Sequence, residues 1–147
     1  MLRRFTPALL LVAASLSAQS TIRLHTNLGT YHKDIGTKVP AAQQYFDQGL
    51  RLVYGFNHAE AIRSFARAAE LDPNCAMCYW GIAYAYGPHV NAGMDSASGV
   101  KAYEAVQKAR GLSAKAKPWQ RAYVEADRKS TRLNSSHPRL SRMPSSA

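Results

Sequence analysis

Residues 45–73 have the sequence YFDQGLRLVYGFNHAEAIRSFARAAELDP, and this stretch decides the fold. Apolar side chains recur at helical spacing through residues 42–53, which predicts an amphipathic helix there. Gly55 is placed to end that helix. Asn57 followed by Glu60 matches an N-terminal capping box and predicts the start of a second helix. The stretch therefore predicts a helical hairpin.

The second predicted helix ends at a turn formed by Asp72, Pro73 and Asn74, where Asn74 is placed to cap a third helix. Three landmarks then recur at a spacing of 34 residues. The recurring pairs are Tyr45 and Tyr79, Gly49 and Ala83, and Leu52 and Tyr86. A period of this length is typical of stacked helical hairpins.

This period resembles the tetratricopeptide repeat (TPR) family. The positions that carry the resemblance are Tyr45, Gly49, Ala61, Phe65, Ala68, Pro73, Tyr79, Ala83 and Tyr86. Gln48 departs from the leucine that is usual in the family. The resemblance implies an all-α fold, a right-handed solenoid of helix-turn-helix repeats of which about 2 to 2.5 precede a truncation. The run from Tyr45 to Gly87 also looks like a group of exported bacterial repeat proteins.

The second repeat carries an insertion. Gly87 and Pro88 interrupt its helical pattern, and residues 87–98 are predicted to form a loop. The closing helix is expected at about residues 98–110, with Gly111 as its C-cap. Three residues of this helix, Ala102, Val106 and Ala109, repeat the spacing of Ala61, Phe65 and Ala68.

A further helix is expected after the second repeat, opened by Pro118 with Trp119, Ala122 and Tyr123 turned inward. The expected organisation is an extended or irregular segment at 19–40, then a repeat region at 41–126 divided into repeat 1 (42–75), repeat 2 (76–111) and the start of a further helix (113–126).

The N-terminus has the order of a secretory signal peptide. Arg3 and Arg4 form a basic start, residues 7–16 are apolar, and small residues follow up to Ala18. The apolar run is shorter than the roughly 20 residues that a membrane-spanning helix needs. We therefore expect residues 1–18 to be removed near Ala18, a periplasmic or secreted bacterial location, and no membrane span in the mature chain.

Residues 127–147 resemble the translation of a common short-read sequencing adapter. The segments DRKSTRLNSSH at 127–137 and SRMPSSA at 141–147 correspond to its two constant parts. Pro138, Arg139 and Leu140 between them fit its variable index. We interpret 127–147 as an adapter artefact that is disordered and that truncates the native chain.

Resequencing the parent genomic DNA tests this interpretation. We expect the native reading frame to depart from the printed sequence after about Ala126, because only the residues before it follow the repeat pattern. A native gene that encodes the same residues through Ala147 would contradict the interpretation.

The formal net charge of +10 suggests a nucleic-acid binder only if it belongs to one folded domain. Residues 127–147 contribute five basic side chains and one acidic one, and Arg3 and Arg4 lie in the signal. Residues 19–126 keep 12 basic and 8 acidic side chains, an ordinary surface charge. We therefore expect no nucleic-acid partner.

Cys75-Ala-Met-Cys78 is the sharpest local motif. Covalent haem attachment requires a histidine where Tyr79 stands, and a zinc site requires two further ligands. A thioredoxin-like redox pair requires a βαβ context, which a helical pattern lacks. The motif therefore favours a local disulfide between Cys75 and Cys78, or two buried thiols, and no cofactor is expected.

His58 and His89 fall at the same end of the two predicted hairpins. A metal site there would need a third ligand, so no metal site is assigned. Asn91 and Asp95 are the polar candidates of the insertion for binding a ligand.

The function predicted from sequence is non-catalytic binding. The chain contains no G-x-S-x-G, H-E-x-x-H or phosphate-loop motif. The TPR resemblance implies a protein or peptide partner, held in an extracytoplasmic assembly on the concave face that the first helix of each repeat builds. The residues expected to line that face are Phe46, Leu50, Val53, Trp80 and Tyr84.

Two alternatives stay open at this point. One is a redox or metal accessory role that uses Cys75 and Cys78. The other is that the repeats are the N-terminal region of a larger protein whose catalytic part is missing. Metal analysis tests the first alternative, and the full reading frame decides the second.

Overall fold

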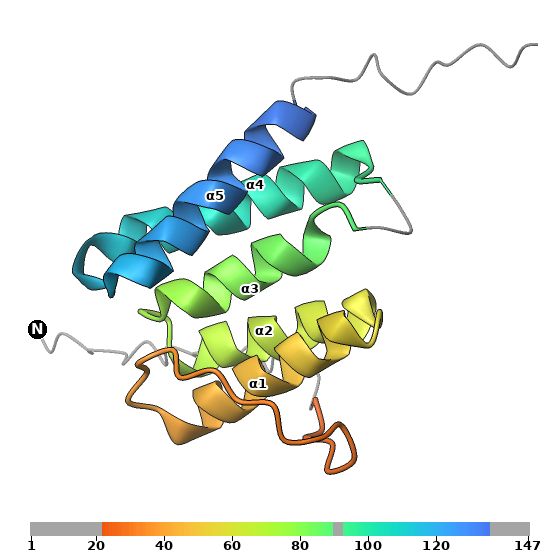
Figure 1. Ribbon diagram of the computed structural model, residues 1–147, viewed down its shortest axis with the longest axis vertical. Coiled ribbons are helices and arrows are strands. Elements are labelled where there is room, and N and C mark those ends of the chain that lie inside the picture. Colours follow the sequence, from red (N-terminus) through yellow and green to blue (C-terminus); the bar gives the residue numbers. More distant parts are fainter. Residues whose placement is uncertain (1–21, 90–92, 136–147) are drawn as a thin grey trace, which may run out of the picture.

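The computed structural model describes residues 22–89 and 93–135, and the predicted all-α class is confirmed for this part of the chain (Figure 1). Its elements are α1 (Pro40–Tyr54), α2 (His58–Leu71), α3 (Ala76–Tyr86), α4 (Ser96–Leu112), the 3-10 helix η1 (Ser113–Lys115) and α5 (Pro118–Ser135). The expected signal peptide and Asn91 lie outside the described residues.

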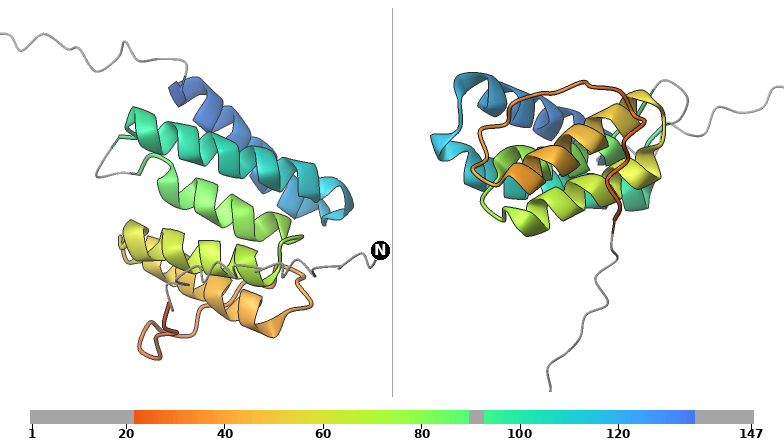
Figure 2. Two further views of the ribbon diagram at one scale, coloured as in Figure 1. Left: turned by 180° about the vertical axis from the view of Figure 1, so that it is seen from behind. Right: turned by 90° about the horizontal axis from the view of Figure 1, so that it is seen from below.

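The helices pack as successive hairpins in two layers. α1 packs against α2, α3 packs against α4, and α3 also contacts α1 and α5. α1, α3 and α5 therefore form one layer, while α2 and α4 lie behind it (Figure 2). We call the outer surface of the first layer the α1–α3–α5 face.

Phe65 of α2 is the centre of the packing between the first two hairpins. Its side chain is fully buried, and its ring centroid lies 5.3 Å from that of Phe46. Gly49 of α1 and Gly81 of α3 both face this ring. A Cβ atom would lie 2.6 Å from the ring at Gly49 and 2.4 Å at Gly81, closer than any side chain permits. The two glycines therefore let α1 and α3 approach Phe65 directly.

α2 and α4 bury corresponding positions. The three positions that share one spacing in each helix have no exposed surface: Ala61, Phe65 and Ala68 in α2, and Ala102, Val106 and Ala109 in α4. These are the positions that repeat across the insertion in the sequence. The two helices thus present the same small–large–small pattern to their partners.

The helix ends follow the sequence only in part. Asn57 caps α2 as predicted, since its side chain accepts from the backbone N–H of Glu60 at 3.3 Å. The reciprocal half of the capping box is absent, because the Glu60 carboxylate pairs with Arg63. The cap of α3 is Cys75 and not Asn74, since the Cys75 sulfur accepts from the N–H of Cys78.

The insertion is shorter and α4 longer than predicted. α4 begins at Ser96, where Asp95 serves as N-cap by accepting from the N–H of Ser98 at 2.8 Å. The Asp95 carboxylate therefore has a structural role at the start of α4. Gly111 does not end the helix, which continues to Leu112 because helical φ and ψ angles are open to glycine as well.

α5 begins at Pro118 as predicted but is rotated relative to the expectation. Gln120 and Val124 are its buried side chains before residue 126, whereas Ala122 and Tyr123 are exposed. The helix also continues to Ser135, so the expected disorder is wrong for residues 127–135. No proline or glycine interrupts residues 119–135, and nothing in the chain stops the helix there. The helical conformation of residues 127–135 does not test whether their coding sequence comes from the adapter.

Residues 22–39 contain no helix or strand and wrap around α1; we call them the N-terminal strap. Its first part is held by Gln48, whose side-chain amide accepts from the N–H of His25 at 2.7 Å and donates to the carbonyl of Arg23 at 3.0 Å. The same amide also donates to Ser64 of α2. Gln48 therefore anchors the strap, a role that a leucine at this position could not fill.

Candidate functional site

Four of the five residues predicted to line an open groove are buried instead. Phe46 packs against Trp80 with ring centroids 6.4 Å apart, and Leu50 and Val53 belong to the same core cluster. Because these side chains pack between the helices, they do not form the open groove that was predicted. Tyr84 alone remains partly exposed.

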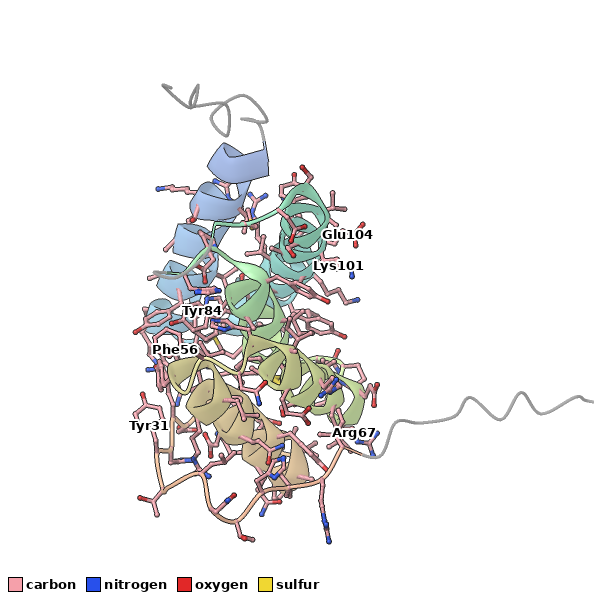
Figure 3. All side chains as sticks on the ribbon, turned by 90° about the vertical axis from the view of Figure 1, so that its right-hand side faces the viewer. Tyr31, Phe56, Arg67, Tyr84, Lys101 and Glu104 are labelled. Atoms are coloured by element: carbon pink, nitrogen blue, oxygen red, sulfur yellow. A yellow bond between two sulfur atoms is a disulfide. The ribbon has the colours of Figure 1, made fainter. Side chains whose placement is uncertain are left out.

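An open pocket of about 310 Å³ lies beside this core, where α1 and α3 end. Its lining is Val53, Tyr54, Phe56, His58, Tyr84, Pro88 and His89. Tyr54 and Phe56 are each more than half exposed, which is unusual for large aromatic side chains. Tyr31, Phe56 and Tyr84 lie on one side of the molecule, whereas Arg67, Lys101 and Glu104 lie on the opposite side (Figure 3). These three aromatic side chains are thus separated from the three labelled charged side chains of α2 and α4.

The backbone at Phe56 explains how its ring comes to be exposed. Phe56 has φ = 60°, in the left-handed region that non-glycine residues seldom adopt. Three backbone hydrogen bonds close this turn, donated by Gly55 to Arg51, by Phe56 to Val53 and by Asn57 to Leu52. The turn therefore fixes the ring at the edge of the pocket.

His58 and His89 lie next to each other, as expected from their predicted positions at the same end of the two hairpins. Their rings stack with centroids 4.2 Å apart and an interplanar angle of 17°. The Nδ1–H of His58 donates to the carbonyl of Phe56 at 3.2 Å. Among the described residues no group of three side chains is placed to hold a metal ion. The pair therefore serves as one wall of the pocket.

The titration of Tyr54 gives a testable property of the pocket. Burial, followed by the neighbouring Tyr31, raises the pKa of Tyr54 from 10.0 to about 12. Because the folded state holds this proton more tightly than the unfolded chain does, the resulting stability is complete below pH 10.0 and is lost as the pH rises toward about 12. We expect a late component in the phenolate absorbance titration, which Tyr54→Phe reduces and Tyr103→Phe retains; some late titration remains in Tyr54→Phe because burial also raises the pKa of Tyr84. A single step shared by all tyrosines would contradict this.

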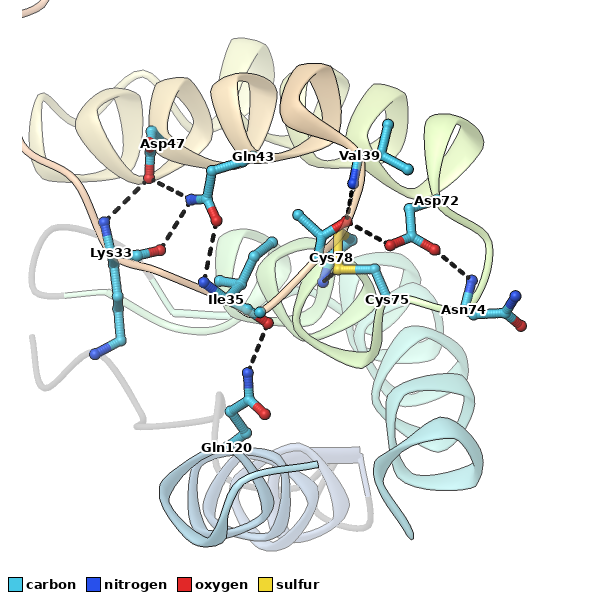
Figure 4. The surroundings of a disulfide bond; sticks show 12 residues. Lys33, Ile35, Val39, Gln43, Asp47, Asp72, Asn74, Cys75, Cys78 and Gln120 are labelled. Carbon is cyan, nitrogen blue, oxygen red and sulfur yellow. Dashed lines mark hydrogen bonds between the residues drawn. A yellow bond between two sulfur atoms is a disulfide. The ribbon is translucent and has the colours of Figure 1, made fainter. Parts of the chain in front are cut away.

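The second part of the strap lies between α1 and α5, where polar side chains hold its backbone (Figure 4). The side-chain amide of Gln43 donates to the carbonyl of Lys33 at 2.9 Å and accepts from the N–H of Ile35 at 3.1 Å. Asp47 accepts from the N–H of Lys33 at 3.1 Å. From the other side, Gln120 donates to the carbonyl of Ile35 at 2.8 Å. The face thus satisfies both backbone groups of each of these two strap residues.

The ammonium group of Lys33 lies over two aromatic rings of α5. Its Nζ atom is 4.3 Å from the ring centroid of Trp119 and 5.2 Å from that of Tyr123. Both distances are within the range of a cation–π interaction. The Tyr123 ring is partly exposed at this edge of α5, where it also contacts the Trp80 ring of α3 with centroids 5.4 Å apart.

The residues that hold the strap were not predicted from the sequence. Gln43, Asp47 and Arg51 are spaced four apart on α1, which puts them on one side of the helix. Such a polar stripe was available as a signal but is equally typical of a solvated helix face. No local pattern distinguishes Gln120, because its partner Ile35 is 85 residues away.

The possible disulfide between Cys75 and Cys78 is present. Both sulfur-bearing side chains are buried at the start of α3, next to the strap. Cys78 is fully enclosed, whereas Cys75 lines an open pocket of about 270 Å³ between the strap and the start of α3. The motif therefore contributes a constraint and a helix cap at this end of α3.

Comparison with known proteins adds no relatives: no protein-family model, curated protein or solved structure matches the chain. Within the described part, no helix has both the length and the apolar character required to cross a bilayer.

Proposed function

We propose that the chain is a TPR-like scaffold of an extracytoplasmic assembly that binds an extended segment of a partner protein without catalysis. The single observation that carries the proposal is the aromatic pocket, in which Tyr54, Phe56 and Tyr84 come together from two helices and a turn. Exposed aromatic rings around a concavity are the typical anchoring points of protein and peptide partners.

Two further observations support the TPR-like and extracytoplasmic parts of the proposal. The landmark positions 34 residues apart have similar environments: Tyr45 and Tyr79 both pack against the core, and Gly49 and Ala83 are both buried. A disulfide such as that between Cys75 and Cys78 persists in an oxidising compartment, which agrees with the signal-like N-terminus.

The alternatives have less support. A redox role would need an accessible sulfur; Cys78 is fully buried, and Cys75 is 7% exposed where it lines a pocket beside the strap. A metal role would need a third ligand beside His58 and His89, and the described residues do not place one there. Whether the repeats precede a catalytic region is a question for the full reading frame.

A displayed library of extended peptides, selected on the chain from Gln19 onward, tests the proposed function. We expect selected peptides to lose at least roughly tenfold in affinity for a Tyr54→Ser/Phe56→Ser variant, because aromatic anchors dominate such interfaces. Tyr103→Ser is the matched control, since Tyr103 is an exposed ring on α4 outside the pocket. Peptides that bind all three proteins alike would contradict the proposal.

A further inference from the structure

We propose that residues 31–35 of the N-terminal strap occupy a peptide site on the α1–α3–α5 face, and that a partner segment with a basic residue two positions before a branched aliphatic residue binds there by displacing the strap. The inference rests on the proposed function, because it names the chemistry of the segment that this face takes.

The α1–α3–α5 face holds the strap largely through its backbone, although Asp47 also contacts the His32 ring, with 2.7 Å between Oδ2 and Nδ1. Gln43, Asp47 and Gln120 hold the N–H and carbonyl groups of Lys33 and Ile35. Arg51 adds a bond to the carbonyl of Tyr31 at 2.8 Å. None of these backbone bonds depends on which side chain the strap carries. Any extended segment that enters this site in the same direction finds the same partners.

Three alternate side chains of the strap, at positions 31, 33 and 35, each contact side chains of the α1–α3–α5 face. This spacing matches the period of two of an extended chain. Tyr31 contacts Tyr54 edge to face with centroids 5.5 Å apart. Lys33 lies over Trp119 and Tyr123. Ile35 is buried in the core cluster, and it is the only buried side chain of the described strap. Backbone bonds supply the affinity, and these three subsites supply the preference for an aromatic, a basic and an aliphatic residue.

Glycines on both sides of residues 30–35 would let this segment leave the face and a partner segment take its place. The segment from Thr30 to Ile35 lies between Gly29 and Gly36, whose φ angles are 79° and 72°. Both angles lie in the region that favours glycine, and both residues are exposed, so the chain has a pivot on each side of the segment. Gln48 anchors the strap before the first pivot and stays bound when the segment between the pivots leaves.

The open aromatic pocket extends this site at one end. Tyr54 lines the pocket and is also the residue that Tyr31 contacts. A partner segment that replaces the strap therefore continues from the Tyr31 position toward Phe56 and Tyr84. One extended segment thus covers both the strap site and the pocket.

A labelled peptide with the strap sequence GTYHKDIGT, residues 29–37, tests the proposal by fluorescence anisotropy. The peptide is titrated into the chain from Gln19 onward and into its Ile35→Asp variant, in which the strap carries a charge that its apolar subsite rejects. We expect at least roughly tenfold tighter binding to Ile35→Asp, because the built-in competitor is weakened. Thr30→Asp is the matched control: it adds the same charge at an exposed position, and binding should equal that of the unmodified chain.

Peptide variants test the predicted chemistry on the same Ile35→Asp protein. Replacing the peptide lysine by glutamate, or its isoleucine by aspartate, should weaken binding at least roughly tenfold, because each change removes one subsite contact. Replacing the peptide aspartate by asparagine should leave binding nearly unchanged, since the only partner of Asp34 outside the strap among the described residues is exposed Lys117, and an asparagine oxygen can still accept from the N–H of Gly36. Equal binding of all four peptides would overturn the proposal.

Hydrogen exchange on the unmodified chain keeps the proposal falsifiable if Ile35→Asp fails to fold. We expect the amides of Lys33 and Ile35 to exchange at least roughly 100-fold faster than those in the middle of α1, because the strap opens without global unfolding. Exchange as slow as in α1 would overturn the proposal and make the strap a fixed part of the fold.

Light scattering at increasing protein concentration tests whether the site is instead occupied by the strap of a second copy of this chain. A dimer that Ile35→Asp abolishes would mean that the strap exchanges between copies, and it would overturn the partner segment. The two proposals can fail separately. If the Tyr54→Ser/Phe56→Ser variant loses affinity for selected peptides but Ile35→Asp does not bind the strap peptide more tightly, only the displacement of the strap is overturned.

Discussion

Replacing Phe65 by alanine is expected to lower the free energy of unfolding by about 3–5 kcal/mol. The ring of Phe65 is fully buried, and it lies where α2 packs against α1 and α3. Gly49 and Gly81 carry no side chains that could move into the vacated space, so the cavity cannot collapse from either side. This places the change at the upper end of large-to-small substitutions.

Urea unfolding followed by circular dichroism at 222 nm measures this loss, with Tyr103→Ala as the control. Tyr103 is an aromatic side chain exposed on α4, and its truncation should change the unfolding free energy by no more than about 0.5 kcal/mol. A Phe65→Ala protein that loses less than about 1 kcal/mol would show that the ring does not fill the space between α1 and α3.

Adding a single methyl group at Gly81 is expected to destabilise the protein by about 1–3 kcal/mol or more. The new Cβ atom would lie 2.4 Å from the Phe65 ring, and relief requires either the ring or the α3 backbone to move. Gly49→Ala should behave similarly, since its Cβ would lie 2.6 Å from the same ring. Both changes act by overpacking, the opposite of the cavity in Phe65→Ala.

A smaller side chain at position 65 should rescue the glycine variants. In a double-mutant cycle, Gly81→Ala combined with Phe65→Leu should cost less than the sum of the two single changes, because the leucine leaves room for the methyl group. Gly111→Ala is the matched control: it lies in α4 with nothing within 4 Å of its Cβ, and it should stabilise the helix by about 0.5–1 kcal/mol. Strict additivity in the cycle would contradict the contact.

The helical hairpins and their buried small residues were predictable from the sequence because they depend on short-range periodicity. The pattern of Ala61, Phe65 and Ala68 specifies which side of α2 faces inward, and the structure buries all three. The N-cap at Asn57 follows from local chemistry in the same way. Neither inference needed knowledge of distant parts of the chain.

The groove residues were predicted wrongly because periodicity identifies an apolar side of a helix but not what covers it. Phe46, Leu50, Val53 and Trp80 lie on apolar sides of α1 and α3 that the packing of the helices closes. The residues left exposed at the end of α1, Tyr54 among them, follow from where the neighbouring helices stop.

The strap was beyond the reach of sequence reasoning for a related reason. Ile35 has partners on both α1 and α5, and its bond to Gln120 crosses 85 residues. Isolated polar residues in an irregular segment carry no period, and glutamine side chains on helices are usually solvated. Only the assembled face shows that these amides substitute for backbone partners.

The ring of Phe65 between two glycines also constrains how this sequence can evolve. Gly49 and Gly81 belong to different hairpins, yet the acceptability of a side chain at either position depends on position 65. The three positions therefore form an epistatic unit: a larger residue at one becomes tolerable only after a smaller one has been fixed at position 65. Divergent copies of this hairpin pair should accordingly change the three positions in a set order, with the reduction at position 65 first.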